Sequence, residues 1–354
     1  MKRLLRHVSQ LLPALLALVL LAFILRSADL ARSLALVQSL GWKIPFLLLP
    51  TFVATLSETF GWWLAFARLG GRPRFRSLLR VRIVTDAVML GLPSGTVISE
   101  SLQPYLLKRR CGVPFEAGII AGLGRKFLVV MSHGLFLGLS VFLAWPLLQQ
   151  ASRAAIGRGG LPIILLAGAG ALIVAALGLA ALGVHGNVAD RVHRLLDRFG
   201  GRWLGGWLER NALRFEAADE HLATFFTHRP AGLAPPLVCY LFAWFARSLE
   251  TLLFLSLLGV SVALAGAMVM ETALILVRAM AVPVPAGLGV QDAGYVLSLK
   301  GLGVEDAVTV GAAFVLLKRG KDLFWIAFGF LLFAMGRDRK ELPPSVPPAG
   351  VVSP

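Results

Sequence analysis

The chain consists largely of long apolar runs separated by short polar segments, with no sustained alternation of apolar and polar positions. A helix needs about 20 apolar residues to cross a hydrocarbon core of roughly 30 Å. The pattern therefore predicts an all-α, polytopic helical membrane protein with about six full spans. We place these spans at about Leu11–Leu25, Ile44–Phe66, Gly118–Trp145, Leu161–Val184, Pro235–Leu258 and Val310–Met335.

Two further apolar stretches are interrupted by a Pro-x-Gly sequence. The first covers about 78–107 and breaks at Pro93-Ser94-Gly95; the second covers about 265–300 and breaks at Pro285-Ala286-Gly287. In the first stretch each arm is only about 15 residues, too short to cross alone, and both flanks are basic. We therefore expect two broken re-entrant helical hairpins, each entering and leaving on the same face of the membrane.

The two halves of the chain repeat at a fixed offset of 192 residues, without a gap. Repeat 1 covers about 44–145 and repeat 2 about 235–336. Matches of charged, Pro and Gly residues at one offset are much less expected by chance than apolar matches. Broken helices in corresponding positions of two halves are typical of a binding or transport site between them. The matched pairs are Glu58/Glu250, Thr59/Thr251, Pro93/Pro285, Gly95/Gly287, Glu100/Asp292, Lys108/Lys300 and Lys126/Lys318.

Composition supports a single transmembrane domain over residues 1–340. Mean hydropathy is +0.77 and 57% of residues are hydrophobic. The longest polar segment, 185–230, has apolar residues at helical spacing, so we expect a cytosolic amphipathic helix or helix pair there. Residues 341–354 form a Pro-rich tail that we expect to be disordered. The first run could be a signal peptide, but an uncleaved first span fits the topology better.

The net charge of +16 reflects the distribution of basic residues beside the spans rather than a nucleic-acid surface. Placing the N-terminus in the cytosol puts 22 Lys and Arg on the cytosolic side and 6 outside, as the positive-inside rule requires. We therefore expect a multi-pass protein of the bacterial inner membrane with both termini cytosolic. In this topology the spans of Glu58 and Glu250 run in opposite directions. The repeats are then inverted, and the hairpins enter from opposite faces to meet near the midplane.

Ionisable residues inside the spans are candidates for function, because an ionised side chain at the bilayer centre costs about 2.5–3.5 kcal/mol on insertion scales. Glu58, Glu250 and Arg247 are candidates for proton transfer or ion pairing. Helical spacing allows local pairs between Arg247 and Glu250 and between Lys318 and Asp322. His133 is either a hydrogen-bonded core residue or a proton relay.

The second arm of each hairpin begins at a helix N-terminus after Gly95 or Gly287. Free N–H groups and the helix dipole at such an end attract anions. Glu100 and Asp292 lie early on these arms, where they would cap the helix, balance cations or carry protons. We expect a substrate-binding site for a phosphate or polar headgroup, with basic residues from the spans that follow. These are Arg125, Lys126, Lys318 and Arg319.

No enzyme motif is present in the sequence: it contains no Gly-x-Ser-x-Gly, no His-Glu-x-x-His and no P-loop. Cys111 and Cys239 have neither disulfide nor metal spacing, so we read both as free thiols. We accordingly expect no catalytic residues, no metal and no cofactor.

The chain resembles the family built on the transmembrane region of lysylphosphatidylglycerol synthase, also called flippase-like membrane proteins. The resemblance covers most of residues 5–340 and is carried by the segments around both breaks and by the basic pairs beyond them. The first break, Pro93-Ser94-Gly95-Thr96, departs from the family's Pro-Gly-Arg-x-Gly-Glu form. The resemblance implies lipid translocation without the aminoacylating domain of the larger relatives. It also suggests the subgroup associated with hopanoid synthesis.

The leading hypothesis is translocation of a lipid with a phosphate or polar headgroup across the membrane. The first alternative is a membrane-embedded lipid or isoprenoid-linked transferase, with Glu58, Glu100, Glu250 or Asp292 as general base. The second is a non-catalytic scaffold that holds a lipid-synthesis enzyme as its partner.

Overall fold

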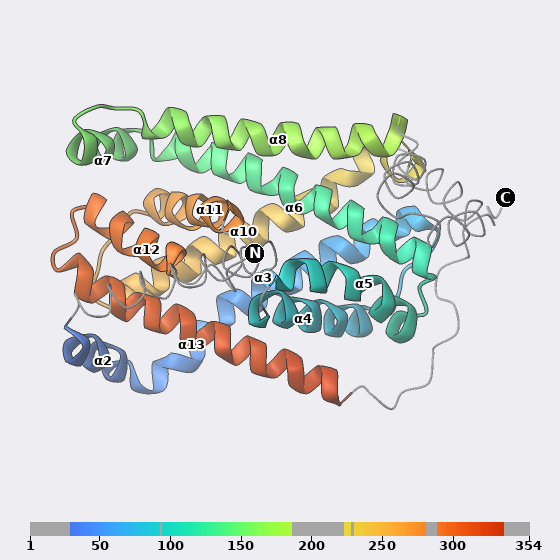
Figure 1. Cartoon of the computed structure of the whole chain (residues 1–354), viewed down its shortest axis with the longest axis horizontal. Helices are drawn as coiled ribbons and strands as arrows, with labels where there is room; N and C mark the ends of the chain where they lie inside the picture. The colour runs from blue at the N-terminus through green and yellow to red at the C-terminus, as the bar shows by residue number, and fades with distance from the viewer. Residues whose placement is uncertain (1–28, 93, 186–222, 228–229, 281–288, 336–354) are drawn as a thin grey trace, which may run out of the picture.

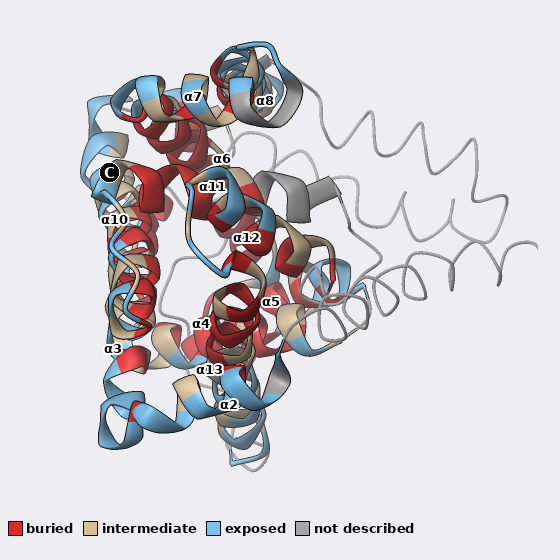
Figure 2. Cartoon of the chain, turned by 90° about the vertical axis from the view of Figure 1, so that its left-hand side faces the viewer, coloured by how far each residue is buried: buried red, intermediate tan, exposed pale blue. Residues whose placement is uncertain are grey.

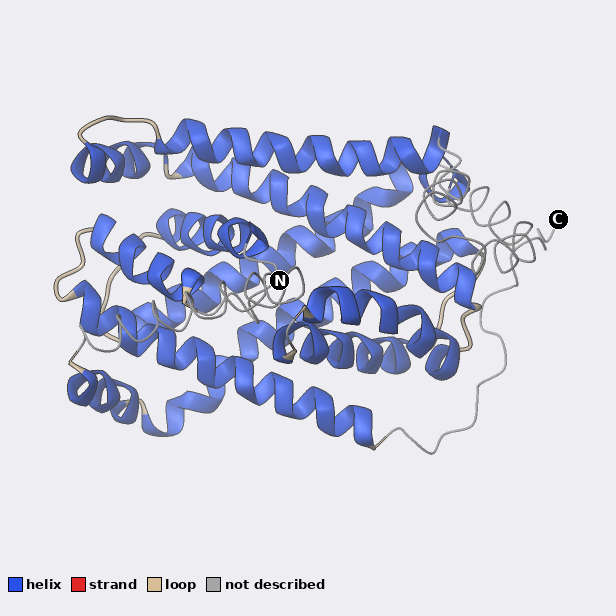
Figure 3. Ribbon diagram, in the orientation of Figure 1, coloured by secondary structure: helices blue, strands red, loops and turns tan. Residues whose placement is uncertain are grey.

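The computed structural model of the chain describes residues 29–92, 94–185, 223–227, 230–280 and 289–335. Within these ranges the regular structure is helical, without a strand (Figure 3). The predicted all-α fold is therefore confirmed. The first predicted span, most of the 185–230 segment and the 341–354 tail lie outside the described residues.

Four of the described helices are long and apolar enough to cross a membrane. They lie within Gly41–Leu69, Phe115–Leu143, Leu161–Val184 and Ala231–Leu257, and they contain α3 (Leu49–Ala65), α6 (Phe115–Leu143), α8 (Leu161–His185) and α10 (Ala234–Leu257). The last predicted span is α13 (Ala307–Ala334), which is 28 residues long. This length lies within the range of 24 to 29 residues of the other four, but four charged residues between 318 and 322 lower its hydropathy.

The span predicted at Ile44–Phe66 begins differently from the expectation. Its first part, η1 (Gly41–Leu48), is a 3-10 helix with Pro45 inside it, and the α-helix starts only at Leu49, with Pro50 in its first turn. Proline has no N–H to donate and is tolerated in the first turn of an α-helix. A second short 3-10 helix, η2 (Phe66–Leu69), ends the span at Gly70, which has φ 79°.

The first broken hairpin consists of α4 (Phe75–Gly91) and α5 (Gly95–Cys111), which pack against each other. The chain reverses at Ser94, which has a left-handed backbone with φ 55°. A Cβ on Gly95 would lie 2.4 Å from the carbonyl oxygen of Val88. The glycine therefore allows the start of α5 to lie directly against the end of α4, as the Pro-x-Gly break predicted.

The second hairpin consists of α11 (Leu264–Met280) and α12 (Val290–Gly301), which also pack together. The predicted break at Pro285-Ala286-Gly287 lies outside the described residues. Figure 1 shows that α4 and α5 extend from one end of the long axis to the middle, whereas α11 and α12 extend from the opposite end. The two hairpins therefore enter from opposite ends, as the inverted repeat requires.

The packing of the long helices also follows an inverted repeat. In the first hairpin, α5 packs on α6 and α4 packs on α13; in the second, α12 packs on α13 and α11 packs on α6. Each hairpin is thus held between one long helix of its own half and one of the other half. The long helices α6 and α13 run in opposite directions (Figure 1).

The two halves meet along the antiparallel pair α3 and α10. Ala54, Ala243 and Ala246 form a small buried cluster between these helices. A Cβ on Gly61 would lie 2.9 Å from the carbonyl oxygen of Pro236, so the two backbones approach closely there. Figure 2 shows this pair as one wall of the molecule, with its buried residues turned toward the other helices.

Two helices were not predicted: α2 (Leu30–Ser39) and α7 (Trp145–Ile156). Both lie at the same end of the long axis (Figure 1). α7 begins where Trp145 was taken as the end of a span, has Pro146 in its first turn, and ends at Gly157 with φ 69°. Such short amphipathic helices lack the long apolar run that identifies a span.

Candidate functional site

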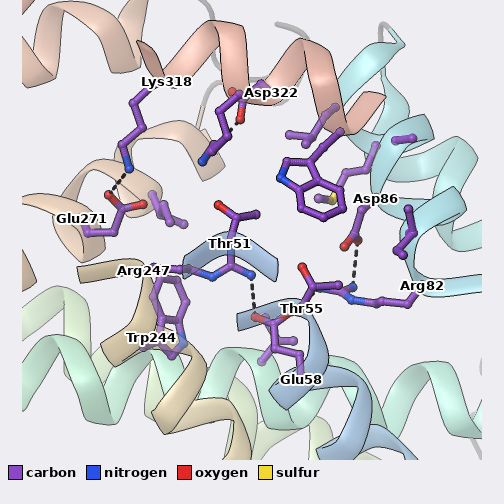
Figure 4. A pocket seen from close by; sticks show the side chains of 18 of the residues that line it. Thr51, Thr55, Glu58, Arg82, Asp86, Trp244, Arg247, Glu271, Lys318 and Asp322 are labelled. Carbon is purple, nitrogen blue, oxygen red and sulfur yellow. Dashed lines mark hydrogen bonds and ion pairs between the residues drawn. The ribbon is translucent and has the colours of Figure 1, made fainter. Parts of the chain in front are cut away.

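A cavity of about 270 Å³ lies between the two halves of the protein. Its lining residues come from α3, α4, α5 and α6 of the first half and from α10, α11, α12 and α13 of the second. Both hairpins therefore contribute to one site, as expected for doubled broken helices. Figure 4 shows polar and charged side chains of both halves converging on this space. The charged residues that line it are Glu58, Arg82, Asp86, Glu100, Arg125, Lys126, Arg247, Glu271, Lys318, Arg319, Lys321 and Asp322.

Glu58 on α3 is the centre of one buried ion cluster. One carboxylate oxygen accepts a hydrogen bond from Arg247 Nη2 on α10 at 2.7 Å, and the other accepts one from Arg82 Nη2 on α4. Arg82 Nη1 also lies 2.9 Å from Asp86 on its own helix. Glu58 and Arg82 are each more than nine-tenths buried. A buried charge persists when it is paired and hydrogen-bonded, so this cluster ties the first hairpin to both central helices (Figure 4).

Glu250 on α10, the repeat counterpart of Glu58, is the centre of a second cluster. Its Oε1 accepts hydrogen bonds from Lys318 Nζ at 2.8 Å and from Lys321 Nζ at 2.7 Å, and Oε2 accepts one from the hydroxyl of Thr51 on α3. Lys318 Nζ also lies 3.0 Å from both Thr251 Oγ1 and Glu271 Oε2. Its ammonium therefore has three oxygen partners, which use all three of its N–H donors.

The acids on the second arms of the hairpins are both paired with the long helix that follows. Glu100 accepts a hydrogen bond from Lys126 Nζ at 2.7 Å, with Arg125 Nη2 at 3.7 Å. Asp292 accepts one from Arg319 Nη2 at 2.6 Å. The repeat aligns Lys126 with Lys318, yet the lysine pairs with the arm acid only in the first half. In the second half the neighbouring arginine takes that position.

Asp292 also caps its own helix. Its Oδ2 accepts a hydrogen bond from the backbone N–H of Gly289 at 2.9 Å, so the carboxylate satisfies part of the α12 N-terminus. At the start of α5, the N–H groups of Gly95 and Val97 donate to backbone oxygens of Leu92 and Ser94. Gly95 lies against α4 and is not among the residues that line the cavity. In the first hairpin, the groups that reach the cavity are therefore side chains rather than the N-terminus of α5.

The local pairs predicted from helical spacing are wrong. Arg247 pairs with Glu58 instead of Glu250, and Lys318 pairs with Glu250 and Glu271 instead of Asp322. Residues spaced by one turn lie on the same helix face, but that face also contacts other helices. A buried cation there pairs with carboxylates across the helix interface.

The other site residues predicted from sequence fall into three groups. The cavity is lined by Glu58, Glu100, Arg125, Lys126, Arg247, Lys318 and Arg319. Glu250 and Asp292 stand directly behind the lining, each bonded to a cation that reaches the cavity. Gly287 lies outside the described residues.

Sequence reasoning missed several cavity residues, among them Arg82, Thr51, Trp244 and Trp325. Arg82 was grouped with the basic residues flanking the first hairpin. Its spacing of four from Asp86, inside an apolar arm, was the available signal for a buried pair. Nothing in the sequence distinguished the two tryptophans from other membrane aromatic residues.

Several buried N–H donors beside the cavity have no partner among the described residues. They are Nε of Arg82, Nε of Arg125 and Nε1 of Trp325. The Arg125 guanidinium lies 5.4 Å from the ring centre of Trp62, which supports its position without satisfying this donor. Buried donors without acceptors are uncommon in native structures. They can donate to oxygen atoms of a bound molecule.

His133 occupies a packed, hydrogen-bonded position on α6. Its Nε2 lies 2.9 Å from the carbonyl oxygen of Thr272 on α11. Its ring stacks on Trp244 with 4.5 Å between ring centres. Of the two expectations for this residue, the geometry matches the hydrogen-bonded core residue.

Comparisons with known proteins identify the family and no individual relative. No curated protein and no solved structure matches the chain. One family model, described as "Lysylphosphatidylglycerol synthase TM region", matches residues 10–329 and so covers both hairpins and the cavity between them. The chain thus belongs to the family of the lysylphosphatidylglycerol synthase transmembrane region.

Proposed function

We propose that this protein binds the polar or anionic headgroup of a membrane lipid in the cavity and passes it across the bacterial inner membrane. The observation that carries the proposal is the position of the cavity. It lies between hairpins that enter from opposite ends, and charged residues of both halves line it. Membership of the family supports a lipid-related function in the membrane.

The contrast between cavity and outer surface favours an amphiphile as the ligand. The exposed faces of the spans are apolar, with Phe142, Val174 and Leu331 each more than half exposed. Charged groups are concentrated inside, where they are costly unless they have a role or a partner. A lipid fits both environments, because its headgroup can occupy the cavity while its acyl chains remain against the apolar surface.

The free donors beside the cavity favour a headgroup rich in oxygen acceptors. Arg125 is buried, and within the described part of the chain its nearest carboxylate contact is 3.7 Å away and its Nε has no partner. Among the residues that the structure describes, Lys126 pairs with Glu100, and it keeps 44% of its side chain exposed. Arginine can bind a phosphate through two parallel hydrogen bonds. We therefore assign Arg125 and Lys126 the role of holding a phosphate or similar group.

We further propose that the protein moves the lipid without modifying it. The carboxylates considered as general bases, Glu58, Glu100, Glu250 and Asp292, each form an ion pair with Arg or Lys. Their role in this proposal is to balance buried cations. If a transferase role were correct, a deletion strain would show altered lipid species rather than an altered distribution between leaflets.

The test is a leaflet-exchange assay with purified protein in vesicles of phosphatidylcholine and phosphatidylglycerol. Short-chain fluorescent phosphatidylglycerol and phosphatidylethanolamine are incorporated into both leaflets during reconstitution, and albumin extracts the labelled lipid from the outer leaflet. We expect the extractable fraction to exceed that of protein-free vesicles, and Arg125→Gln to lower the exchange rate. Lys108→Gln, at an exposed position at the far end of α5, is the matched control. Exchange no faster than in protein-free vesicles for both lipids would contradict the proposal.

A further inference from the structure

The inverted repeat contains two equivalent aromatic pairs, and each joins the two halves. Phe52 on α3 stacks on Trp325 on α13, with 6.2 Å between ring centres and 6° between ring planes. Trp244 on α10 stacks on His133 on α6, with 4.5 Å and 22°. Trp244 lies 192 residues after Phe52, and Trp325 lies 192 residues after His133. The two pairs therefore occupy the same place in the repeat, on opposite sides of the central helices.

The pair formed by Trp244 and His133 is locked in place. Each of these two residues is only 6% exposed. Trp244 Nε1 donates to Ser132 Oγ at 3.2 Å, and His133 Nε2 lies 2.9 Å from the Thr272 carbonyl oxygen. The Arg247 guanidinium also lies 5.9 Å from the Trp244 ring centre. In addition, the helices carrying this pair, α6 and α10, pack closely against each other.

The pair formed by Phe52 and Trp325 lacks these constraints. Phe52 is 37% exposed on the outside of a membrane span, while Trp325 lines the cavity and its buried indole N–H has no partner among the described residues. One ring therefore faces the outer surface and the other faces the cavity. The stack therefore lies between the outer surface and the cavity.

We infer that the lipid enters and leaves the cavity laterally, between α3 and α13, by displacing the Phe52–Trp325 stack. This inference rests on the proposed function and specifies the route by which the lipid reaches the cavity. The indole N–H of Trp325 donates to an oxygen of the headgroup as it passes. Lys321 and Asp322, which also line the cavity on α13, lie about one turn before Trp325. The headgroup thus passes from Trp325 directly to charged side chains. The locked pair on the other side keeps that wall closed.

The test is a removable cross-link across the stack. In a background with Cys111→Ser and Cys239→Ala, the double variant Phe52→Cys with Trp325→Cys is joined by a short bis-methanethiosulfonate reagent. Albumin extraction of the short-chain fluorescent phosphatidylglycerol then measures exchange. We expect cross-linking to reduce the exchange rate to that of protein-free vesicles. Dithiothreitol should then return the rate to the value that the same sample had before cross-linking.

The matched control joins α3 to its neighbour inside the first half. Phe60 and Phe75 form an aromatic contact between α3 and α4, with 6.4 Å between ring centres, and neither residue lines the cavity. We expect a cross-link between Phe60→Cys and Phe75→Cys to leave the exchange rate unchanged. Continued exchange in fully cross-linked Phe52→Cys/Trp325→Cys protein would overturn the lateral route and leave the proposed function standing.

A second readout separates the route from the function. A phospholipid with a photoactivatable diazirine in its acyl chain is added to vesicles containing the unmodified protein, and labelled peptides are mapped. We expect labelling around Phe52 and Trp325 that unlabelled phospholipid competes away. If the protein catalyses no exchange, the proposed function fails, and the labelling decides the route. Labelling around His133 and Trp244, or labelling without competition, would overturn the route.

Discussion

Arg247 on α10 donates a hydrogen bond to Glu58 on α3, with 2.7 Å between Nη2 and Oε1, and this contact joins the two halves of the protein. The same carboxylate accepts a hydrogen bond from Arg82. Glu58 therefore separates two guanidinium groups in a buried site. Removing one member of a buried ion pair leaves an uncompensated charge, so the carboxylate is the critical member of this cluster.

We predict that Glu58→Gln is more destabilising than Arg247→Gln. The first change leaves Arg82 and Arg247 facing each other without the carboxylate they share, at a cost of about 3–5 kcal/mol. The second leaves Glu58 paired with Arg82. The thermal unfolding midpoints of the two purified variants in detergent test this prediction, and Glu58→Gln should have the lower midpoint. Equal midpoints, or a lower midpoint for Arg247→Gln, would show that the carboxylate does not hold the cluster together.

Lys126 and Lys318 occupy equivalent positions in the repeat but differ in their surroundings. Lys318 keeps 6% of its side chain exposed and has three oxygen partners among the described residues, whereas Lys126 keeps 44% exposed and has one such partner. We predict that Lys318→Met lowers the thermal midpoint strongly, because Glu250 and Glu271 lose a shared cation. Lys126→Met should cost about 0–1 kcal/mol, as for an exposed ion pair, while still slowing lipid exchange. Similar losses of stability in both variants would contradict the assignment.

These two lysines also show how far the sequence could predict the site. The fixed offset of 192 residues identified both as members of one repeated set, and the hydrophobic pattern placed both in long helices. Their partners could not be predicted this way. Whether Lys318 bonds to Glu250 or to Asp322 depends on how α10, α11 and α13 cross. Helical spacing shows which residues share a face of one helix, but not which residues of other helices lie against that face.

The fold was more predictable than the site for a related reason. The span at Leu161–Val184 matches its apolar run, because length and composition alone decide whether a helix can cross. The break at Gly95 was visible because only glycine permits that backbone approach. The short helix α7 was missed, because its amphipathic pattern is brief and its role depends on helices it meets only in the folded state.

Gly95 provides a direct test of the hairpin geometry. We predict that Gly95→Ala is strongly destabilising, because its Cβ would lie 2.4 Å from the carbonyl oxygen of Val88 and 2.5 Å from that of Met89. Because the clash would be with backbone atoms, it can be relieved only by moving α5 away from α4. Gly170→Ala on α8 is the control, since a Cβ there would meet nothing within 4 Å beyond its chain neighbours and the backbone of its own helix. Alanine there should be neutral or stabilise the helix by about 0.5–1 kcal/mol. The thermal midpoints of the two variants should move in opposite directions or differ widely.

Asp292 combines two roles that substitutions can separate. Its Oδ2 caps the Gly289 N–H and its Oδ1 pairs with Arg319. Asn keeps an acceptor for the cap and loses the charge; Ala loses both. We predict that Asp292→Ala has a lower thermal midpoint than Asp292→Asn, by the equivalent of about 0.5–2 kcal/mol for a lost helix cap. Identical midpoints would show that the cap contributes nothing to stability.

The opposite entry of the two hairpins can be tested without reference to any lipid. Arg76 lies at the foot of the first hairpin and Lys300 at the foot of the second, and both are exposed. In the background with Cys111→Ser and Cys239→Ala, we predict that Arg76→Cys and Lys300→Cys react with a membrane-impermeant maleimide from opposite sides of the membrane. From the basic residues around the first hairpin we expect Arg76 on the cytosolic side, so Arg76→Cys should react in inverted vesicles and Lys300→Cys in intact spheroplasts. Reaction of both from one side would show that the hairpins do not enter from opposite faces, and the cavity would then lack the inverted symmetry on which a path between leaflets depends.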